Sequence, residues 1–275
     1  MPASTTGTPL RHVDIKDQPG FRSIALLCLA LLYAPILIVM IFSLNSGNIV
    51  THWEGVTLAW YASALANEEF HSAARNTLTI SVTATIVATT LATTAAIGMT
   101  RVKPWRGLGV SFAAINLPLM VPEIITGVAT LSFFALLAGT FGLNFGIGNL
   151  ILAHTVFCIP FAYMPIKARL DDMDLTLENA AADLYATPWN AFRRVTFPLL
   201  LPGVLSGLAL AFIVSFDDFT ITQLVAGPGQ TTLPLYIWNQ IRRPMTPEIN
   251  AISTILLLVS IIFVSVSFVI ARRRK

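Results

Sequence analysis

The chain has 275 residues, of which 55% are hydrophobic and only 11% are charged, and its formal net charge is +3. Soluble domains carry about 25% charged residues, so this composition, with a mean hydropathy of +0.73, excludes a soluble globular protein and indicates an integral membrane protein. The pI near 9.1 would suggest a nucleic-acid partner in a soluble protein, but orientation in a bilayer explains it better, and no nucleic-acid partner is expected.

The N-terminal part of the chain predicts a tail and two membrane spans. Residues 1–23 are polar and predict a cytoplasmic tail. The apolar run 24–44 has about the 20 residues that a spanning helix needs, and it is too long for a signal-peptide core, so we expect it to be retained. The second span, 76–99, is rich in Thr, Ser and Ala, a composition that lets helices approach closely. We therefore expect it to face protein or water more than lipid.

The third and fourth predicted spans, 108–138 and 149–166, are both interrupted by proline. The four prolines are Pro118, Pro122, Pro160 and Pro165. Broken helices can form gates in transporters. Proline is also an ordinary kink where neighbouring helices satisfy the freed carbonyl groups, so both interpretations stay open.

The last two predicted spans are 199–216 and 251–271, and a basic tail follows at 272–275. Gly203 and Gly207 form a small-xxx-small pair on the fifth span, which permits close helix packing.

The distribution of Lys and Arg orients these six spans. Only Arg75, Arg242 and Arg243 fall on the outer side when the N-terminus is inside, which leaves 14 of the 17 basic residues on the inner side. Because basic residues concentrate in cytoplasmic loops, both termini are predicted to be cytoplasmic. The sequence thus predicts an all-α membrane protein with a six-span transmembrane domain over 24–271.

The long polar interval 170–202 lies on the predicted cytoplasmic side. One helical face is apolar and consists of Leu177, Ala180, Ala181 and Leu184. Thr187-Pro188 reads as an N-cap followed by proline at the first helical position, so a second short helix should begin there. Such a pair of helices indicates a docking surface, with an interfacial loop resting on lipid headgroups as the alternative.

The sequence contains no recognisable nucleotide-binding, catalytic or metal-binding motif. It contains no Gly-Lys dipeptide, so no phosphate-binding P-loop can be built. The histidines and the two cysteines, Cys28 and Cys158, show no catalytic or metal-ligand spacing, so we expect neither a cofactor nor a metal site nor an enzyme. Energised work would require a partner that hydrolyses the nucleotide.

Within this topology, the segment 168–198 resembles the coupling loop of permeases from binding-protein-dependent ABC importers. The family pattern is roughly E-A-A, three residues, Gly, and then nine or so residues to an apolar-Leu-Pro. Here it reads Asn179-Ala180-Ala181, Ala182-Asp183-Leu184, Tyr185-Ala186 and, at its end, Phe192 to Pro198. The resemblance implies a type I ABC importer permease fold whose coupling helix inserts into a cleft of a partner ATPase dimer. It assigns this role to Glu178, Asn179, Ala180, Ala181, Asp183, Leu184, Tyr185, Ala186 and Thr187.

Two positions depart from the pattern. Asn179 stands where the family has glutamate, with Glu178 just before it, and Tyr185 stands at the glycine. Glycine there allows a sharp turn with φ above zero, which a bulky residue disfavours. We therefore expect a different turn or a modified ATPase cleft.

The distal half is similar to the spermidine/putrescine group of permeases. The matching segments are Ser215-Phe-Asp217-Asp218-Phe-Thr, Gly227-Pro-Gly229, Thr232-Leu-Pro234-Leu and Pro247-Glu248-Ile-Asn250-Ala. This resemblance implies the second permease of a heterodimer in the bacterial inner membrane, served by a periplasmic solute-binding protein and carrying a polyamine. An opine or an amino-acid-derived solute stays open, and so does an ion-coupled secondary transporter, although no internal repeat is evident.

Three carboxylates lie within or at the ends of spans: Glu123, Asp217 and Asp218. A carboxylate at membrane depth is costly and needs a pathway, water or a partner, so these residues are candidates for a cation pathway. A structural hydrogen bond for Glu123, and simple solvation for the two aspartates, are the alternatives.

Overall fold

A computed structural model describes residues 20–49, 52–102, 105–242 and 247–272. Of the two predicted tails, 1–23 and 272–275, residues 1–19 and 273–275 lie outside the described ranges. Over the described ranges every named secondary-structure element is a helix, in agreement with the predicted all-α class. The helices are α1 (Phe21–Phe42), α2 (Ala59–Ala66), α3 (Glu68–Thr100), α4 (Leu108–Met120), α5 (Glu123–Phe141), α6 (Ile147–Asp171), α7 (Leu175–Asp183), α8 (Pro188–Ala191), the π-helix η2 (Phe192–Thr196), α9 (Phe197–Phe216), α10 (Thr220–Val225), α11 (Leu233–Ile241) and α12 (Pro247–Arg272).

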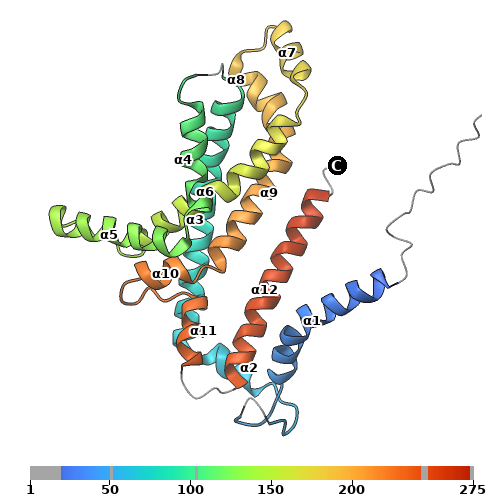
Figure 1. The fold of residues 1–275 in the computed structure, drawn as a ribbon, viewed down its shortest axis with the longest axis vertical. Coiled ribbons are helices and arrows are strands. Elements are labelled where there is room, and N and C mark those ends of the chain that lie inside the picture. The colour runs from blue at the N-terminus through green and yellow to red at the C-terminus, as the bar shows by residue number, and fades with distance from the viewer. Residues whose placement is uncertain (1–19, 50–51, 103–104, 243–246, 273–275) are drawn as a thin grey trace, which may run out of the picture.

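The centre of the molecule is formed by α3, α6 and α9, which pack along one another (Figure 1). A stripe of alanines at every fourth position of α3 is fully buried there: Ala84, Ala88, Ala92 and Ala96. Their small side chains let α6 and α9 approach the α3 backbone closely. One face of this span is thus buried against protein, as its small-residue composition predicts.

The predicted glycine pair on α9 lies at the closest helix contact. A methyl group added at Gly207 would stand 2.6 Å from the backbone oxygen of Ala162 on α6. One at Gly203 would stand 2.6 Å from Cβ of Arg169 on the same helix. Both glycines are buried or half-buried, so the α6–α9 contact depends on the missing side chains.

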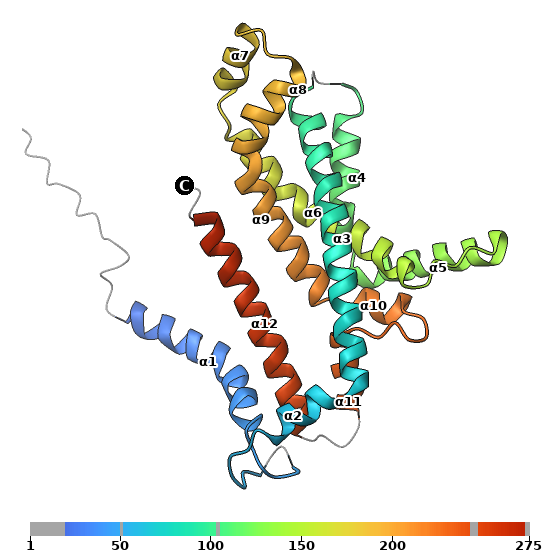
Figure 2. The same ribbon diagram turned by 180° about the vertical axis from the view of Figure 1, so that it is seen from behind.

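The third predicted span differs from the structure. It is divided into α4 and α5, which Figures 1 and 2 show running in different directions, with α5 extending sideways from the bundle. Val121 is extended with ψ 136°, and Pro122 follows it. Proline disfavours the helical region for the residue before it, so the helix ends there. In contrast, α6 continues through both of its prolines.

The described residues contain five helices that are long and apolar enough to cross a membrane, while α4 and the described apolar part of α12 are shorter. With 13 residues, α4 is only about 20 Å long, less than the roughly 30 Å of a hydrocarbon core. The six-span count and the placement of the termini therefore stay predictions. The apolar stretch of α1 has no buried residue at all.

Substitution at the closest helix contact tests this packing. Gly207→Ala should lower the unfolding temperature of the purified protein, because the added methyl meets a backbone oxygen; overpacking of this kind costs about 1–3 kcal/mol. Gly98→Ala is the matched control, since Gly98 lies on α3 with nothing within 4 Å of the added carbon. That control should unfold at the same temperature as the wild type or higher. Equal effects of the two substitutions would contradict the close α6–α9 contact.

Candidate functional site: the coupling loop and a buried acidic cluster

The interval 170–202, which is predicted to be cytoplasmic, contains two short helices, as its sequence predicts. Asp174 caps α7 by accepting a hydrogen bond of 2.9 Å from the backbone N–H of Thr176, and this bond lowers the pKa of the Asp174 carboxyl below its usual value. Thr187 caps α8, where Pro188 is the first helical residue. The π-helix η2 then joins α8 to α9. Single-turn π segments interrupt helices frequently at functional sites.

The predicted apolar face of α7 is not covered by the rest of the described chain. No residue of α7 is buried, although Leu177 and Ala180 lie on that face. In Figure 1, α7 lies at one extreme end of the molecule, beyond the end of α9 that follows the loop. The apolar face of α7 is thus accessible, as a docking helix requires.

Tyr185 adopts the backbone conformation that favours glycine. Its φ is +59°, and it is the single non-glycine residue with positive φ in the described ranges. The Tyr185 N–H donates to the Ala182 carbonyl at 2.9 Å, and the Ala186 N–H donates to the Ala181 carbonyl at 3.0 Å. These two bonds define a Schellman C-cap with Tyr185 at its left-handed position. Of the two expectations, a different turn is therefore wrong: the glycine-type turn is kept, at a strain of roughly 1–2 kcal/mol, and a modified ATPase cleft stays a prediction.

An ion pair fastens α7 to the transmembrane core. The Arg101 guanidinium, at the end of α3, donates from Nε to the Glu178 carboxylate at 3.2 Å. It also donates to the backbone oxygen of Leu170 at the end of α6, at 3.2 Å. Both charged side chains are largely shielded, with 17% and 21% of their surfaces exposed. Glu178 is thereby turned toward its own chain, whereas Asn179, at the motif position, is exposed.

The structure brings a histidine to one of the predicted carboxylates. His154 on α6 is fully buried, and its Nε2 lies 3.3 Å from Oδ2 of Asp218 and 3.1 Å from the Thr222 hydroxyl. Its Nδ1 lies 2.9 Å from the Ser215 hydroxyl. Thr222 donates from both its backbone N–H and its hydroxyl to Asp218, each at 2.9 Å. These contacts join α6, the end of α9 and α10.

His154 is the functional residue that sequence reasoning missed. It is separated by 61 to 68 positions from its partners, so no local spacing marks the cluster. The available signal was an ionisable side chain within an apolar span, which makes a functional site the default hypothesis.

The three candidate carboxylates do not form one group. The Glu123 side chain, in the first turn of α5, lies near those of Asp218 and Thr220. Asp217 is exposed instead and lines a separate cavity of about 350 Å³ between α9 and α12, which includes Phe212 and Ser253. Two neighbouring carboxylates repel each other when both are ionised, so a cation between Glu123 and Asp218 would stabilise the pair.

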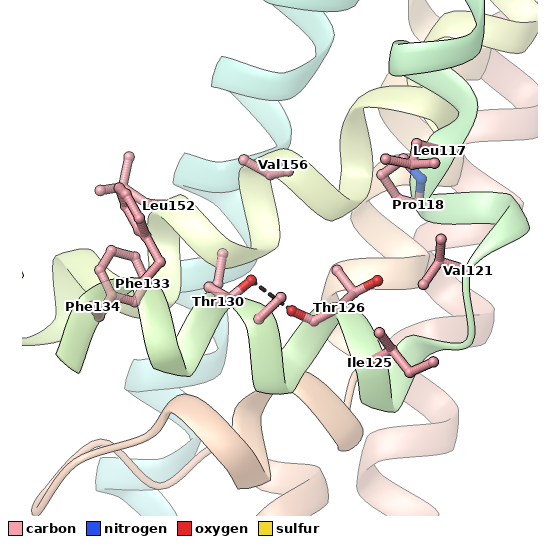
Figure 3. Close-up of a pocket in the computed structure, with 12 residues that line it drawn as sticks. Leu117, Pro118, Val121, Ile125, Thr126, Thr130, Phe133, Phe134, Leu152 and Val156 are labelled. Carbon is pink, nitrogen blue, oxygen red and sulfur yellow. Dashed lines mark hydrogen bonds between the residues drawn. The ribbon is translucent and has the colours of Figure 1, made fainter. Parts of the chain in front are cut away.

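A large groove between α4, α5 and α6 does not suit a cation. It measures about 500 Å³, and Figure 3 shows its lining of aliphatic and aromatic side chains around Thr126 and Thr130. The Thr130 hydroxyl donates to the Thr126 carbonyl at 2.8 Å, and no charged side chain lines the groove. Its chemistry fits acyl chains or an apolar helix.

The Arg101–Glu178 pair can be tested by charge exchange. If the protein works in an ABC importer, as its sequence resemblance implies, Arg101→Glu and Glu178→Arg should each lower ATP-driven uptake several-fold, because each places like charges between α3 and α7. The double variant should recover most of the loss, and contacting residues of this kind couple by roughly 0.5–3 kcal/mol. Uptake into vesicles at matched permease content measures the effect.

Arg106→Glu is the control, since Arg106 is exposed nearby and changes the charge of the chain by the same amount. If Arg101→Glu behaves like Arg106→Glu, or if the double variant shows no recovery, the ion pair does not position α7.

Comparison with known proteins defines the family. The family model described as "Binding-protein-dependent transport system inner membrane component" matches residues 88–273. The chain is 38% identical over 250 residues to the putrescine transport system permease protein PotI of Escherichia coli (strain K12), covering 90% of this chain and 89% of the relative. It is 33% identical over 243 residues to the spermidine/putrescine transport system permease protein PotC of the same organism, covering 88% and 90%.

Solved structures agree on the fold. A bacterial alginate ABC transporter, in complex with a pentasaccharide-bound periplasmic protein, has a chain that matches with a TM-score of 0.72 at 15% identity, over 92% of this chain and 95% of that one. The MetNI methionine ABC transporter, in inward-facing conformations, has one that matches with a TM-score of 0.64 at 16% identity, over 80% and 100%. The chain therefore belongs to the binding-protein-dependent transport system inner membrane components, and it is a permease component of an ABC importer of the inner membrane.

Proposed function

We propose that this permease carries a polyamine, putrescine or spermidine, across the inner membrane by alternating access. It works with a second, homologous permease, a periplasmic solute-binding protein and a cytoplasmic ATPase dimer. The observation that carries the solute class is the similarity to the putrescine and spermidine/putrescine permeases, and the proximity of Glu123 to Asp218 agrees with it. Membership of the ABC importer family favours this function over an ion-coupled secondary transporter.

The acidic cluster supports a cationic solute on physical grounds. Asp218 is fixed by His154 and Thr222, and Glu123 reaches it from α5. An ammonium group offers three donors and a positive charge, which suit two neighbouring carboxylates that repel each other when both are ionised. Because Glu123 stands in the first turn of α5, a helix with few buried residues, movement of α5 would change its distance from Asp218. Such a change would alternately form and open a cation site.

Two exposed apolar elements support the second permease. The apolar stretch of α1 has no buried residue, and that of α5 is 11% buried. An apolar helix that extends from its own bundle, as α5 does in Figures 1 and 2, needs lipid or a neighbouring subunit to cover it. In the proposed heterodimer, these elements contact the second permease and lipid.

The coupling role is tested on the exposed face of α7. Ala181→Glu should abolish association with the ATPase and ATP-driven uptake, since it places a charge on the edge of the apolar face that Ala181 shares with Leu177, Ala180 and Leu184. Ala182→Glu is the matched control: Ala182 is exposed, lies on the opposite side of the helix, and should leave both properties near the wild-type level. Co-purification of the ATPase with the permease, and uptake in vesicles, are measured for both. Unchanged association in Ala181→Glu would rule out this docking face.

The cation site is tested at Glu123. Glu123→Gln should lower polyamine uptake at least about tenfold, equivalent to about 1.4 kcal/mol, because the amide cannot pair with an ammonium group. Glu123→Asp keeps the charge and should restore part of the uptake. Glu54→Gln, an exposed carboxylate in the segment between α1 and α2, should have no effect. Transport of radiolabelled putrescine and spermidine decides the outcome, and full uptake by Glu123→Gln would exclude Glu123 from the pathway.

The opine and amino-acid alternatives are separated by the binding protein. Calorimetric titration of the cognate periplasmic protein with putrescine, spermidine, an opine and amino acids should give binding by the polyamines alone. Binding of an opine with no polyamine binding would redirect the solute assignment without altering the permease role.

A further inference from the structure

We propose that Tyr185, together with Leu184 and Trp189, forms an aromatic anchor that selects the importer's own ATPase subunit. The anchor docks into an apolar pocket with a basic rim on that subunit. This inference rests on the proposed coupling role of the loop, and it adds the residues that determine which ATPase is accepted.

The first argument is the strain at Tyr185. Its backbone has φ +59° at the left-handed position of the Schellman cap, which glycine occupies without steric cost. Packing of the side chain within the permease does not compensate this strain, because 96% of the Tyr185 surface is exposed. Backbone strain is often kept at functional sites. Because the Tyr185 ring is almost fully exposed on the permease, we infer that it contacts a partner protein.

The second argument is the composition of the tip. Leu184 is 82% exposed, Tyr185 is 96% exposed and Trp189 is 65% exposed, and all three fall within six consecutive positions of the loop. The Trp189 ring lies 5.6 Å from that of Phe192, so it is held on one side by its own chain. Tyrosine and tryptophan are enriched among the few residues that supply most of the binding energy of protein interfaces.

The third argument distinguishes a protein from a lipid surface. Between Leu170 and Thr187 the chain carries five carboxylates and no Lys or Arg. The carboxylates are Asp171, Asp172, Asp174, Glu178 and Asp183. The cytoplasmic leaflet has a negative surface potential that attracts basic segments and repels acidic ones. Two of these carboxylates are paired, Asp171 with Lys167 and Glu178 with Arg101, which leaves Asp172, Asp174 and Asp183 to give the α7 segment its negative charge. Exposed Leu184 and Tyr185 beside this negative charge fit a protein pocket with a basic rim better than an anionic lipid surface.

The test uses three substitutions in the complete permease complex. Tyr185→Gly removes the ring and relieves the strain, Tyr185→Ala removes the ring and keeps the strain, and Tyr185→Phe keeps both. We expect the dissociation constant for the purified cognate ATPase to rise at least tenfold for the first two variants and to stay within twofold for the third. In the permease alone, Tyr185→Gly should unfold at a higher temperature than Tyr185→Ala.

Wild-type ATPase affinity in Tyr185→Gly would overturn the inference, and so would a lower unfolding temperature than that of Tyr185→Ala. Ala181→Glu separates this failure from failure of the coupling role. If Ala181→Glu abolishes association while Tyr185→Gly preserves it, the loop docks without the anchor. If neither substitution weakens association, the coupling role itself fails.

A lipid contact is examined directly with brominated phospholipids in vesicles that contain the permease. The Trp189 contribution is the difference in fluorescence between the wild type and Trp189→Phe. We expect this contribution to escape quenching by the bromine atoms and to shift to shorter wavelength when the ATPase is added. Quenching by the lipids in the absence of the ATPase would overturn the anchor in favour of an interfacial loop.

Discussion

The close contact of α3, α6 and α9 is the constraint on which the remaining structure depends. It is made possible by side chains that are absent or small: the alanine stripe of α3 and the glycines of α9, whose missing methyl groups leave room for the α6 backbone. Between helices in a bilayer there is little hydrophobic driving force, so van der Waals packing at short range must supply the stability. The α3–α6–α9 bundle is consequently the rigid body against which both functional regions are placed.

Each functional region is attached to this bundle at one end of α6. Near its beginning, α6 carries His154, which fixes Asp218 at the junction of α9 and α10. At its other end, the Leu170 carbonyl accepts a hydrogen bond from Arg101, which also holds Glu178 of α7. In the proposed complex, a displacement of α7 by an ATPase would thus reach α3 and α6 directly through Arg101. The same helix then links the coupling loop to the acidic cluster, although the two are far apart along the bundle.

The two departures from the family pattern have different physical consequences. Asn179 is exposed, so it leaves the chain's own packing unaffected. Tyr185 keeps the turn that glycine would make, and the cost appears as backbone strain and not as a changed path of the chain. The hydrogen bonds of the C-cap outweigh this strain, because they satisfy carbonyl groups at the end of α7 that would otherwise lack partners. This is why a bulky residue could replace glycine without altering the loop.

The sequence by itself determined the helical membrane class, the burial of the second span, the two short helices of the coupling loop and the family. These follow from local patterns: hydropathy, small-residue content, N-caps and a motif of fixed spacing. Only the tertiary structure decided that 108–138 divides at Val121, that Tyr185 accepts a left-handed backbone, and that Glu123 meets Asp218 while Asp217 turns elsewhere. The His154 cluster also belongs to this second group, since its members come from α6, α9 and α10. Contacts between helices depend on their relative rotation and crossing, and no local spacing in the sequence encodes either quantity.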